Sequence, residues 1–152
     1  MDAILPETGG GTALPLDLED TAMTTSLDGV MFWVADVPAT VDFYEQAFGL
    51  RRRWVRDEGD YAQMETGSVV LQFAVETAAP ANGLTIRPLR AGDTPAAVQM
   101  SLTVADVPAA HSRAIGAGAA DVAAPVTKPW GQVVAYVRDR DGILVELATA
   151  GD

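Results

Sequence analysis

Few residues of this chain belong to the types that commonly carry out chemistry. The 152 residues include no cysteine and a single histidine, His111, which excludes a disulfide, a thiolate nucleophile and a sulfur-ligated metal. The arginines at 51–53 offer charge for an anion clamp, but such a run is more typical of solvated strand residues. The glycines at 9–11 lack the strand, helix and lysine of a phosphate-binding loop. Neither a serine–histidine–base arrangement nor a phosphate site is therefore indicated.

The charge balance narrows the possible partners. There are 21 acidic and 10 basic residues, for a net charge of −11. Such a surface repels phosphate backbones, so we expect no nucleic acid and no anionic membrane as partners, whereas cationic small molecules would be attracted. Simple solubility is the alternative explanation. The N-terminus lacks a signal-peptide pattern and no apolar run reaches membrane-spanning length, which predicts a soluble, cytoplasmic protein.

A six-residue segment that occurs twice organises the chain. Residues 34–39, Val-Ala-Asp-Val-Pro-Ala, recur unchanged at 104–109. In each copy an apolar run precedes the segment, the aspartate suits a helix N-cap, and the proline suits the first helical turn. Residues 71–74 resemble residues 145–148, which lie at a similar separation along the chain. A common turn sequence used twice is the alternative, but the extended correspondence favours two copies of one supersecondary unit.

Hydrophobic periodicity and turn residues divide each copy into elements. Helices are predicted at 37–48, ended by Gly49, and at 107–117. Each helix is preceded by one strand and followed by three, giving βαβββ twice. The predicted strands are 30–34, 51–56, 61–65 and 68–75 in the first copy, 98–104, a weak 122–125, 132–138 and 143–148 in the second, with a short strand near 84–89 between the copies.

The resulting organisation is one compact domain with four parts. We predict an acidic N-terminal tail at 1–28, a first module at 29–76, a linker at 77–96 and a second module at 97–150. The tail has no lysine or arginine and is rich in acids, glycine and proline, a composition that buries little apolar surface. Use of this tail as an interaction module remains a separate hypothesis.

Two segments resemble a known superfamily. Asp36 followed by Phe43-Tyr44 and Phe48-Gly49-Leu50 is similar to the first helix of the vicinal oxygen chelate superfamily, which includes glyoxalases, bleomycin-resistance proteins and extradiol dioxygenases. Residues 129–132 and 136–146 resemble its C-terminal signature, with Arg140 in place of the usual proline. The resemblance implies an α+β fold of two βαβββ modules, whose curled mixed sheets surround an open cup, often in a homodimer.

The same resemblance implies where a site would lie. Metal-dependent members place one ligand on each of four strands, and the matching positions here are Gly29, Gln72, Gln99 and Glu146. Glycine offers no side chain and glutamine is a weak neutral ligand, so only Glu146 suits a divalent ion. His111 takes the place of Val41 on the helix face that packs against the sheet. We therefore expect neither a metal nor another cofactor.

Strand alternation around those positions gives the residues expected to line the cup. Tyr136 has a spacing similar to that of a site tyrosine in the extradiol dioxygenases, and Trp54 and Trp130 are placed at the rim. The other expected ligand-binding residues are Met31, Trp33, Gln72, Gln99, Ser101, Thr103 and Glu146. Such a mixture of aromatic and polar groups suits an organic ligand.

Each of these residues also has a structural interpretation. Met31 and Trp33 could fill a collapsed core, and the two glutamines Gln72 and Gln99 could bond to each other. A buried carboxylate needs a partner, and Glu146 could pair with Arg52 or Arg53. All of these alternatives stay open from the sequence alone.

Three functions follow from this reading. The first is a metal-independent protein of the glyoxalase/bleomycin-resistance type that sequesters a cationic or aromatic small molecule, as in antibiotic resistance. The second is a metal-free epimerase, lyase or isomerase with Glu146 as general base and Tyr136 as proton donor. In that case desolvation would raise the pKa of Glu146. The third is a metal-dependent lyase or dioxygenase.

Overall fold

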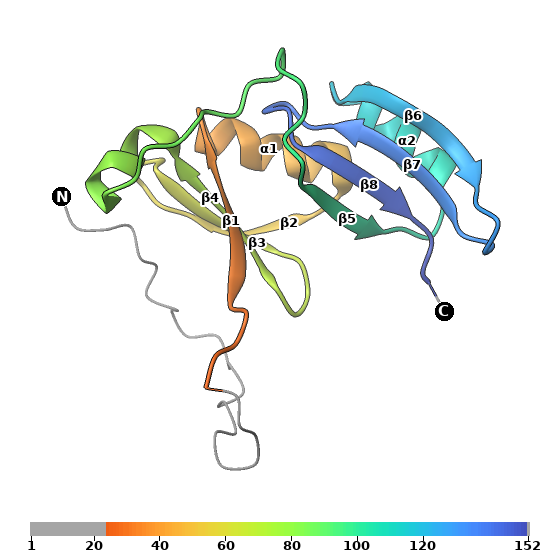
Figure 1. The fold of residues 1–152 in the computed structure, drawn as a ribbon, viewed down its shortest axis with the longest axis horizontal. Coiled ribbons are helices and arrows are strands. Elements are labelled where there is room, and N and C mark those ends of the chain that lie inside the picture. The colour runs from red at the N-terminus through yellow and green to blue at the C-terminus, as the bar shows by residue number, and fades with distance from the viewer. Residues whose placement is uncertain (1–23, 152) are drawn as a thin grey trace.

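The structure, a computed structural model, describes residues 24–151 and consists of two βαβββ modules in sequence (Figure 1). The α+β fold with two modules and unclosed sheets is thereby confirmed. The elements of the first module are β1 (Gly29–Val34), α1 (Val37–Phe48), β2 (Arg51–Val55), β3 (Tyr61–Glu65) and β4 (Val70–Val75). The 3₁₀ helix η1 (Glu76–Asn82) follows. The second module contains β5 (Gln99–Thr103), α2 (Val107–Gly116), β6 (Ala120–Thr127), β7 (Val133–Arg138) and β8 (Leu144–Ala148).

The repeated hexapeptide begins a helix in both modules, as predicted. The side chains of Asp36 and Asp106 accept hydrogen bonds of 3.0 Å from the backbone N–H groups of Ala39 and Ala109. Each bond satisfies one of the N–H groups that a helix leaves without a partner in its first turn. Gly49 ends α1 in the left-handed conformation, with φ of 70°, which a glycine adopts at little cost.

Each module forms a four-stranded mixed sheet. The strand orders are β1-β4-β3-β2 and β5-β8-β7-β6, and the first pair in each order is parallel. The helix of each module packs on one face of its sheet, where the core residues lie: Val34, Val41, Tyr44, Met64, Phe73, Val107, Ala114, Val137, Val145 and Leu147. The opposite face of each sheet carries the predicted site residues that belong to strands, whereas Trp130 lies in the loop before β7. β1 and β5 are the outer strands of their sheets, so in the described part of the chain each has one edge without a strand partner.

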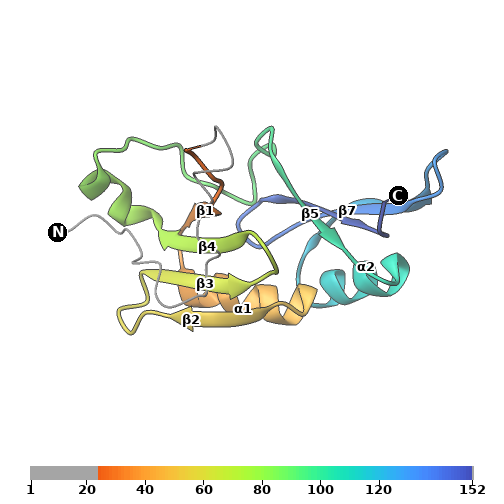
Figure 2. The same ribbon diagram turned by 90° about the horizontal axis from the view of Figure 1, so that it is seen from below.

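Each sheet has one face that lies away from its α-helix, and these two faces point in different directions. Figure 1 shows the second sheet with α2 behind it, and Figure 2, a quarter-turn away, shows the first sheet with α1 behind it. The modules contact each other through α1 and α2 and through the turn between β7 and β8. We call the sheet face that lies away from the α-helix the open face of each module, although Ala78 of η1 packs against Tyr61 and Ala74 on this face of the first module.

One local prediction was wrong, because no strand forms near residues 84–89. Earlier in the same connection, directly after β4, the chain makes the 3₁₀ helix η1. The weak strand predicted at 122–125 is confirmed, but it is longer than expected and belongs to the eight-residue strand β6. Its alanines and Pro125 give little strand signal, and it forms because it pairs with β7. The predicted tail at 1–28 lies mostly outside the described residues.

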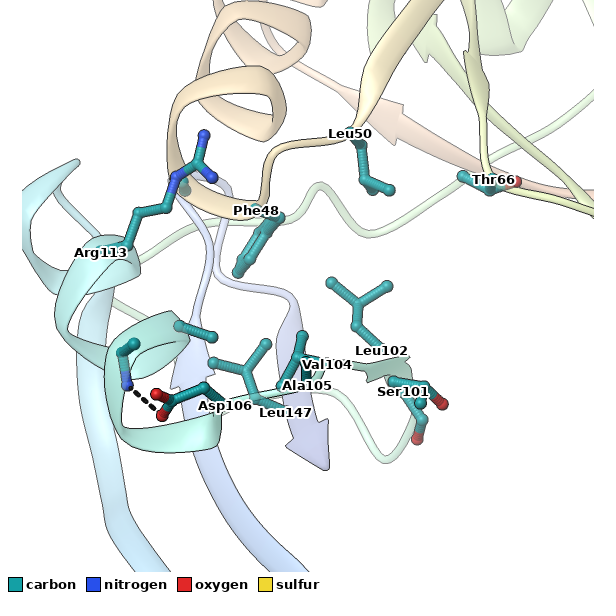
Figure 3. Close-up of a pocket in the computed structure, with 14 residues that line it drawn as sticks. Phe48, Leu50, Thr66, Ser101, Leu102, Val104, Ala105, Asp106, Arg113 and Leu147 are labelled. Atoms are coloured by element: carbon teal, nitrogen blue, oxygen red, sulfur yellow. Dashed lines mark hydrogen bonds between the residues drawn. The ribbon is translucent and has the colours of Figure 1, made fainter. Parts of the chain in front are cut away.

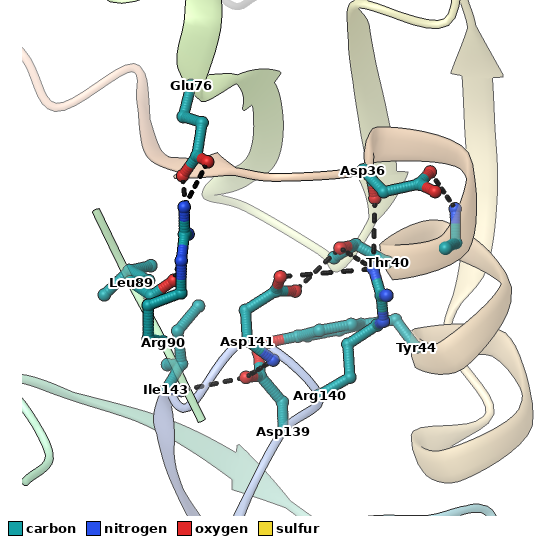
Figure 4. Close-up of polar contacts among 11 residues, drawn as sticks. Asp36, Thr40, Tyr44, Glu76, Leu89, Arg90, Asp139, Arg140, Asp141 and Ile143 are labelled. Atoms are coloured by element: carbon teal, nitrogen blue, oxygen red, sulfur yellow. Dashed lines mark hydrogen bonds and ion pairs between the residues drawn. The ribbon is translucent and has the colours of Figure 1, made fainter. Parts of the chain in front are cut away.

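A buried polar junction joins the two modules (Figure 4). The Tyr44 hydroxyl on α1 donates to Asp139 Oδ2 at 2.5 Å, and the Thr40 hydroxyl donates to Asp141 Oδ2 at 2.7 Å. Asp139 Oδ1 also accepts from the backbone N–H groups of Asp141 and Ile143, at 2.9 and 2.8 Å. Both carboxyls are nearly inaccessible, 3% and 6% exposed. The turn between β7 and β8 is thus held against the first module.

Burial changes the ionisation of this junction. Desolvation raises the pKa of Asp139 to about 6, although the bonds from the Tyr44 hydroxyl and the Ile143 N–H oppose the change. Desolvation also raises the pKa of Asp141, opposed first by the Thr40 hydroxyl. A carboxyl that loses water favours its neutral form unless charged or hydrogen-bonding partners replace the water. The junction therefore takes up a proton in mildly acidic solution.

This proton uptake predicts a pH-dependent stability. The folded pKa of Asp139 exceeds the pKa of 3.8 of an ordinary aspartate. The stabilisation that the bound proton gives the folded state is therefore complete below about pH 3.8. It is lost as the pH rises through the folded pKa. Relative to Asp139→Asn, the wild type should lose up to about 3 kcal/mol of unfolding free energy between about pH 4 and pH 7.

Urea unfolding of both proteins across this range is the measurement. The result is the difference in unfolding free energy between the wild type and Asp139→Asn at each pH. This difference cancels the contribution of Glu45, Glu65 and Glu76, which changes with pH in the opposite direction because their arginine partners lower their pKa values. Parallel stability curves for the two proteins would contradict the prediction.

Candidate functional site

The predicted residues of the second module come together on its open face. Ser101, Glu146 and Tyr136 are neighbours across β5, β8 and β7, so their side chains share one face. The Tyr136 hydroxyl donates to Glu146 Oε2 at 2.7 Å, and the Gln99 amide approaches the same oxygen at 3.4 Å and Ser101 Oγ at 3.1 Å. We call Gln99, Ser101, Tyr136 and Glu146 the second half-site. Thr103 follows on the same face of β5.

This half-site combines one acid with hydroxyl and amide groups. The hydrogen bond to Glu146 raises the pKa of Tyr136, and desolvation adds to the effect. Tyr136 therefore stays protonated at neutral pH and acts as a donor. Glu146 is half-buried, so its second carboxylate oxygen is available to a ligand that donates a hydrogen bond or carries a positive charge.

The predicted residues of the first module also share one face. Met31 and Gln72 are neighbours across β1 and β4, and Gly29 lies at the start of β1. The Gln72 amide nitrogen lies over Gly29, 2.5 Å from the place that a Cβ atom there would occupy. Gln63 on β3 is opposite Gln72 and was not identified from the sequence. We call Gly29, Met31, Gln63 and Gln72 the first half-site.

The aromatic residues expected in the cup differ in their surroundings, because some pack against a buried cluster and one is exposed. Trp33 and Met31 pack against a small cluster formed by Tyr61, Ala74 and Ala78, and so have a packing role as well. The Trp54 ring lies 5.1 Å from that of Tyr61, measured between centroids. Trp130, in contrast, is 66% exposed, and its indole nitrogen donates to Gln132 in the same loop.

The four superfamily ligand positions form two pairs in the single chain. Gly29 lies beside Gln72, and Gln99 lies beside Glu146, but no hydrogen bond connects the pairs within residues 24–151. The alternative that Gln72 and Gln99 bond to each other is therefore not observed. The alternative that Glu146 pairs with Arg52 or Arg53 is not observed either, because Arg52 pairs with Asp42 and Glu45 and Arg53 pairs with Glu65.

These residues do not fit a divalent metal. A Cβ atom at Gly29 would come within 2.7 Å of the Val70 carbonyl oxygen as well as the Gln72 amide, so a ligand side chain cannot be accommodated without a backbone shift. Across residues 24–151, no group of three histidines, cysteines or acids is placed to hold an ion. His111 lies on the helix side, where its Nε2 is 3.0 Å from Asp121, in agreement with a structural role.

A groove that the sequence did not predict lies between the modules (Figure 3). Its volume is about 580 Å³, and it is lined mainly by apolar side chains that include Phe48, Leu50, Leu102, Val104 and Leu147. Its charged groups have structural partners. Arg113 donates to the backbone carbonyls of Gln46 and Glu45 at the end of α1, and Asp106 caps α2.

A second hollow, of about 350 Å³, separates the free edges of β1 and β5. Val30 and Phe32 line it from β1, and Met100 and Leu102 line it from β5. Val30, Val69 and Val98 around this hollow are 43%, 38% and 54% exposed. An apolar region between two unpaired strand edges is a surface that association could cover.

The chain belongs to the Glyoxalase/Bleomycin resistance protein/Dioxygenase superfamily, whose model matches residues 26–147. This membership confirms the resemblance seen in the sequence. No curated protein shows a significant match. No helix within the described residues has the length and apolar character needed to cross a membrane.

Solved structures show the same fold. A glyoxalase-related enzyme from Fulvimarina pelagi is 19% identical with a TM-score of 0.71, over 83% of this chain and 88% of that one. A glyoxalase/bleomycin resistance protein/dioxygenase family enzyme from Burkholderia phytofirmans PsJN is 18% identical with a TM-score of 0.63, over 82% and 98%. TioX from Micromonospora sp. ML1 is 25% identical with a TM-score of 0.60, over 84% and 98%.

Proposed function

We propose that this protein binds an organic small molecule without a metal and sequesters it unchanged. The observation that carries the proposal is the steric closure of Gly29 by the Val70 carbonyl and the Gln72 amide. It removes one of the four positions from which the superfamily holds its ion. The remaining set of two glutamines and one glutamate suits hydrogen bonding to an organic ligand better than coordination.

The proposal includes a homodimer in which the half-sites of two chains combine. The open faces of one chain point in different directions, and the exposed valines beside β1 and β5 provide an apolar surface for association. Pairing of these edges between two copies would join the first half-site of one chain to the second half-site of its partner. The expected stoichiometry is two ligands per dimer, measurable by sedimentation and titration calorimetry.

A thermal-shift screen of cationic and aromatic metabolites tests the binding function. A ligand that binds only the folded protein raises the melting temperature, and the increase should be the same with and without a chelator. The control is the Glu146→Ala, Gln72→Ala double variant, which removes a polar group from each half-site. An increase that disappears on chelation would contradict a metal-independent site.

The short hydrogen bond between Tyr136 and Glu146 favours a second candidate, a metal-free enzyme. Here Glu146 removes a proton next to a carbonyl group and Tyr136 donates to the oxygen that becomes negative. This arrangement fits an epimerase, lyase or isomerase.

Glu146→Gln separates the two candidates, because glutamine keeps the size of the side chain but cannot act as a base. An enzyme should lose at least about a hundredfold in turnover with its fold intact. A sequestering protein should retain ligand binding within about tenfold. Both quantities are measured on the same preparation, with circular dichroism as the control for folding.

A further inference from the structure

The free edge of β5 borders both hollows between the modules. The groove and the second hollow share Thr66, Ser101 and Leu102 in their linings, so the two meet beside this strand. Phe48 and Leu50 line the groove from the first module, and β1 lines the second hollow. A continuous hollow with apolar walls therefore follows the edge of β5, and we call it the edge furrow.

The backbone of β5 has unpaired groups that face the edge furrow. The N–H of Val104, the residue after β5, donates to the Ala148 carbonyl of β8 at 2.8 Å. Successive residues of a strand point their backbone groups to opposite sides, so those of Ser101 and Thr103 point to the free edge. No strand pairs with this edge in the described part of the chain. β5 can therefore pair with one further strand.

β5 also places polar and apolar side chains on opposite faces. Its polar residues share the open face with Glu146, whereas three apolar residues pack against the core on the helix side: Met100, Leu102 and Val104. Figure 3 shows Phe48 and Leu50 across the groove from Leu102 and Val104. A strand that pairs with β5 here needs the same division, with apolar side chains toward Phe48 and Leu50.

A segment with this division precedes β1 in the sequence. Residues 14–19, which lie outside the described residues, read Leu-Pro-Leu-Asp-Leu-Glu. Alternation with a period of two is typical of a strand that has one apolar face. The chain from Leu18 to Gly29 spans up to roughly 36 Å when extended, and the furrow begins beside β1. In Figure 1 the chain enters β1 from the lower side of the picture, toward which the free edge of β5 faces.

We propose that residues 14–18 pair with the free edge of β5 in their own chain as an additional strand, with the leucines in the edge furrow. Pro15 favours the parallel orientation, because the leucines then turn their backbone groups toward β5 and the nitrogen of Pro15 faces away. Asp17 then lies on the polar open face. This inference does not depend on the proposed binding function. It bears on the proposed dimer, because the segment and a second copy compete for the same edge.

Spin labelling tests the position of the segment in the full chain. The chain has no cysteine, so Asp17→Cys provides one attachment point. The label should broaden the amide signals of Ser101 and Thr103 but not those of β6, at the far edge of the same sheet. In a mixture whose isotope-enriched chains lack the label, these signals should stay sharp, because the contact lies within one chain.

Leu16→Asp should release the edge, because it places a charge among apolar side chains. Amide hydrogen exchange at Ser101 and Thr103 should then become at least about tenfold faster than in the wild type. Leu5→Asp is the matched control, since it makes the same change outside the segment, and it should leave the exchange unchanged.

The proposal is overturned if the label leaves the β5 signals sharp or if Leu16→Asp does not change the exchange. Broadening in the mixed sample also overturns it, because a second copy then covers the edge. Sedimentation of the same variants tests the competition, and Leu16→Asp should tighten association about tenfold. A protein that is monomeric in every variant contradicts the proposed dimer and leaves the position of the segment to the spin label.

Discussion

Asp139→Ala should lower the free energy of unfolding by about 3 kcal/mol at neutral pH. The change removes the acceptor of the Tyr44 hydroxyl and of two backbone N–H groups in the turn between β7 and β8. Alanine leaves these three donors buried without partners. Part of the loss is offset because the substitution also removes a carboxylate that burial disfavours.

The measurement is equilibrium unfolding in urea, with two control variants. Asp139→Asn retains an acceptor for the backbone N–H groups and should lose less than the alanine variant. Tyr44→Phe removes the hydroxyl alone. A double-mutant cycle that combines Asp139→Ala with Tyr44→Phe should show a coupling free energy of about 1–2 kcal/mol. Additive effects would mean that the hydroxyl and the carboxyl do not interact in solution.

Gly29→His should not create a metal site, although it introduces a metal-binding side chain at one of the four positions where the superfamily resemblance implies a ligand. The new side chain would overlap the Val70 carbonyl and the Gln72 amide. Overpacking of this kind typically costs about 1–3 kcal/mol. We expect a melting temperature several degrees lower and no stoichiometric binding of zinc or nickel by calorimetry.

Gly29→Ala is the matched control for this experiment. It introduces the Cβ atom without a ligand and should account for most of the destabilisation. A Gly29→His variant that binds one divalent ion per chain and is stabilised by it would show that the site lacks only one ligand. The argument for a metal-independent protein would then fail.

The features that the sequence revealed are those set by local chemistry. The N-caps at Asp36 and Asp106 and the stop at Gly49 depend on a few adjacent residues, and the structure confirms them. β6 was underestimated because its alanines are ordered by pairing with β7 rather than by their own preference. The superfamily pattern identified the fold because its two segments have characteristic spacing.

The site could be predicted only in part. Strand alternation placed Ser101 and Glu146 on one face correctly, since a face repeats every second residue. The contact between Tyr44 and Asp139 spans 95 residues, and no local pattern indicates it. Gln63 was missed for a similar reason, because its role depends on the register between β3 and β4.

The junction between the modules also bears on how the duplicated chain evolved. The first copy contributes hydroxyls, and the second contributes the acids that accept from them. At the offset of seventy residues, the counterparts of Thr40 and Tyr44 are Ala110 and Ala114, which have no hydroxyl. The copies have thus become complementary rather than interchangeable, so a tandem of two first copies would lack half of the joint that keeps the units together.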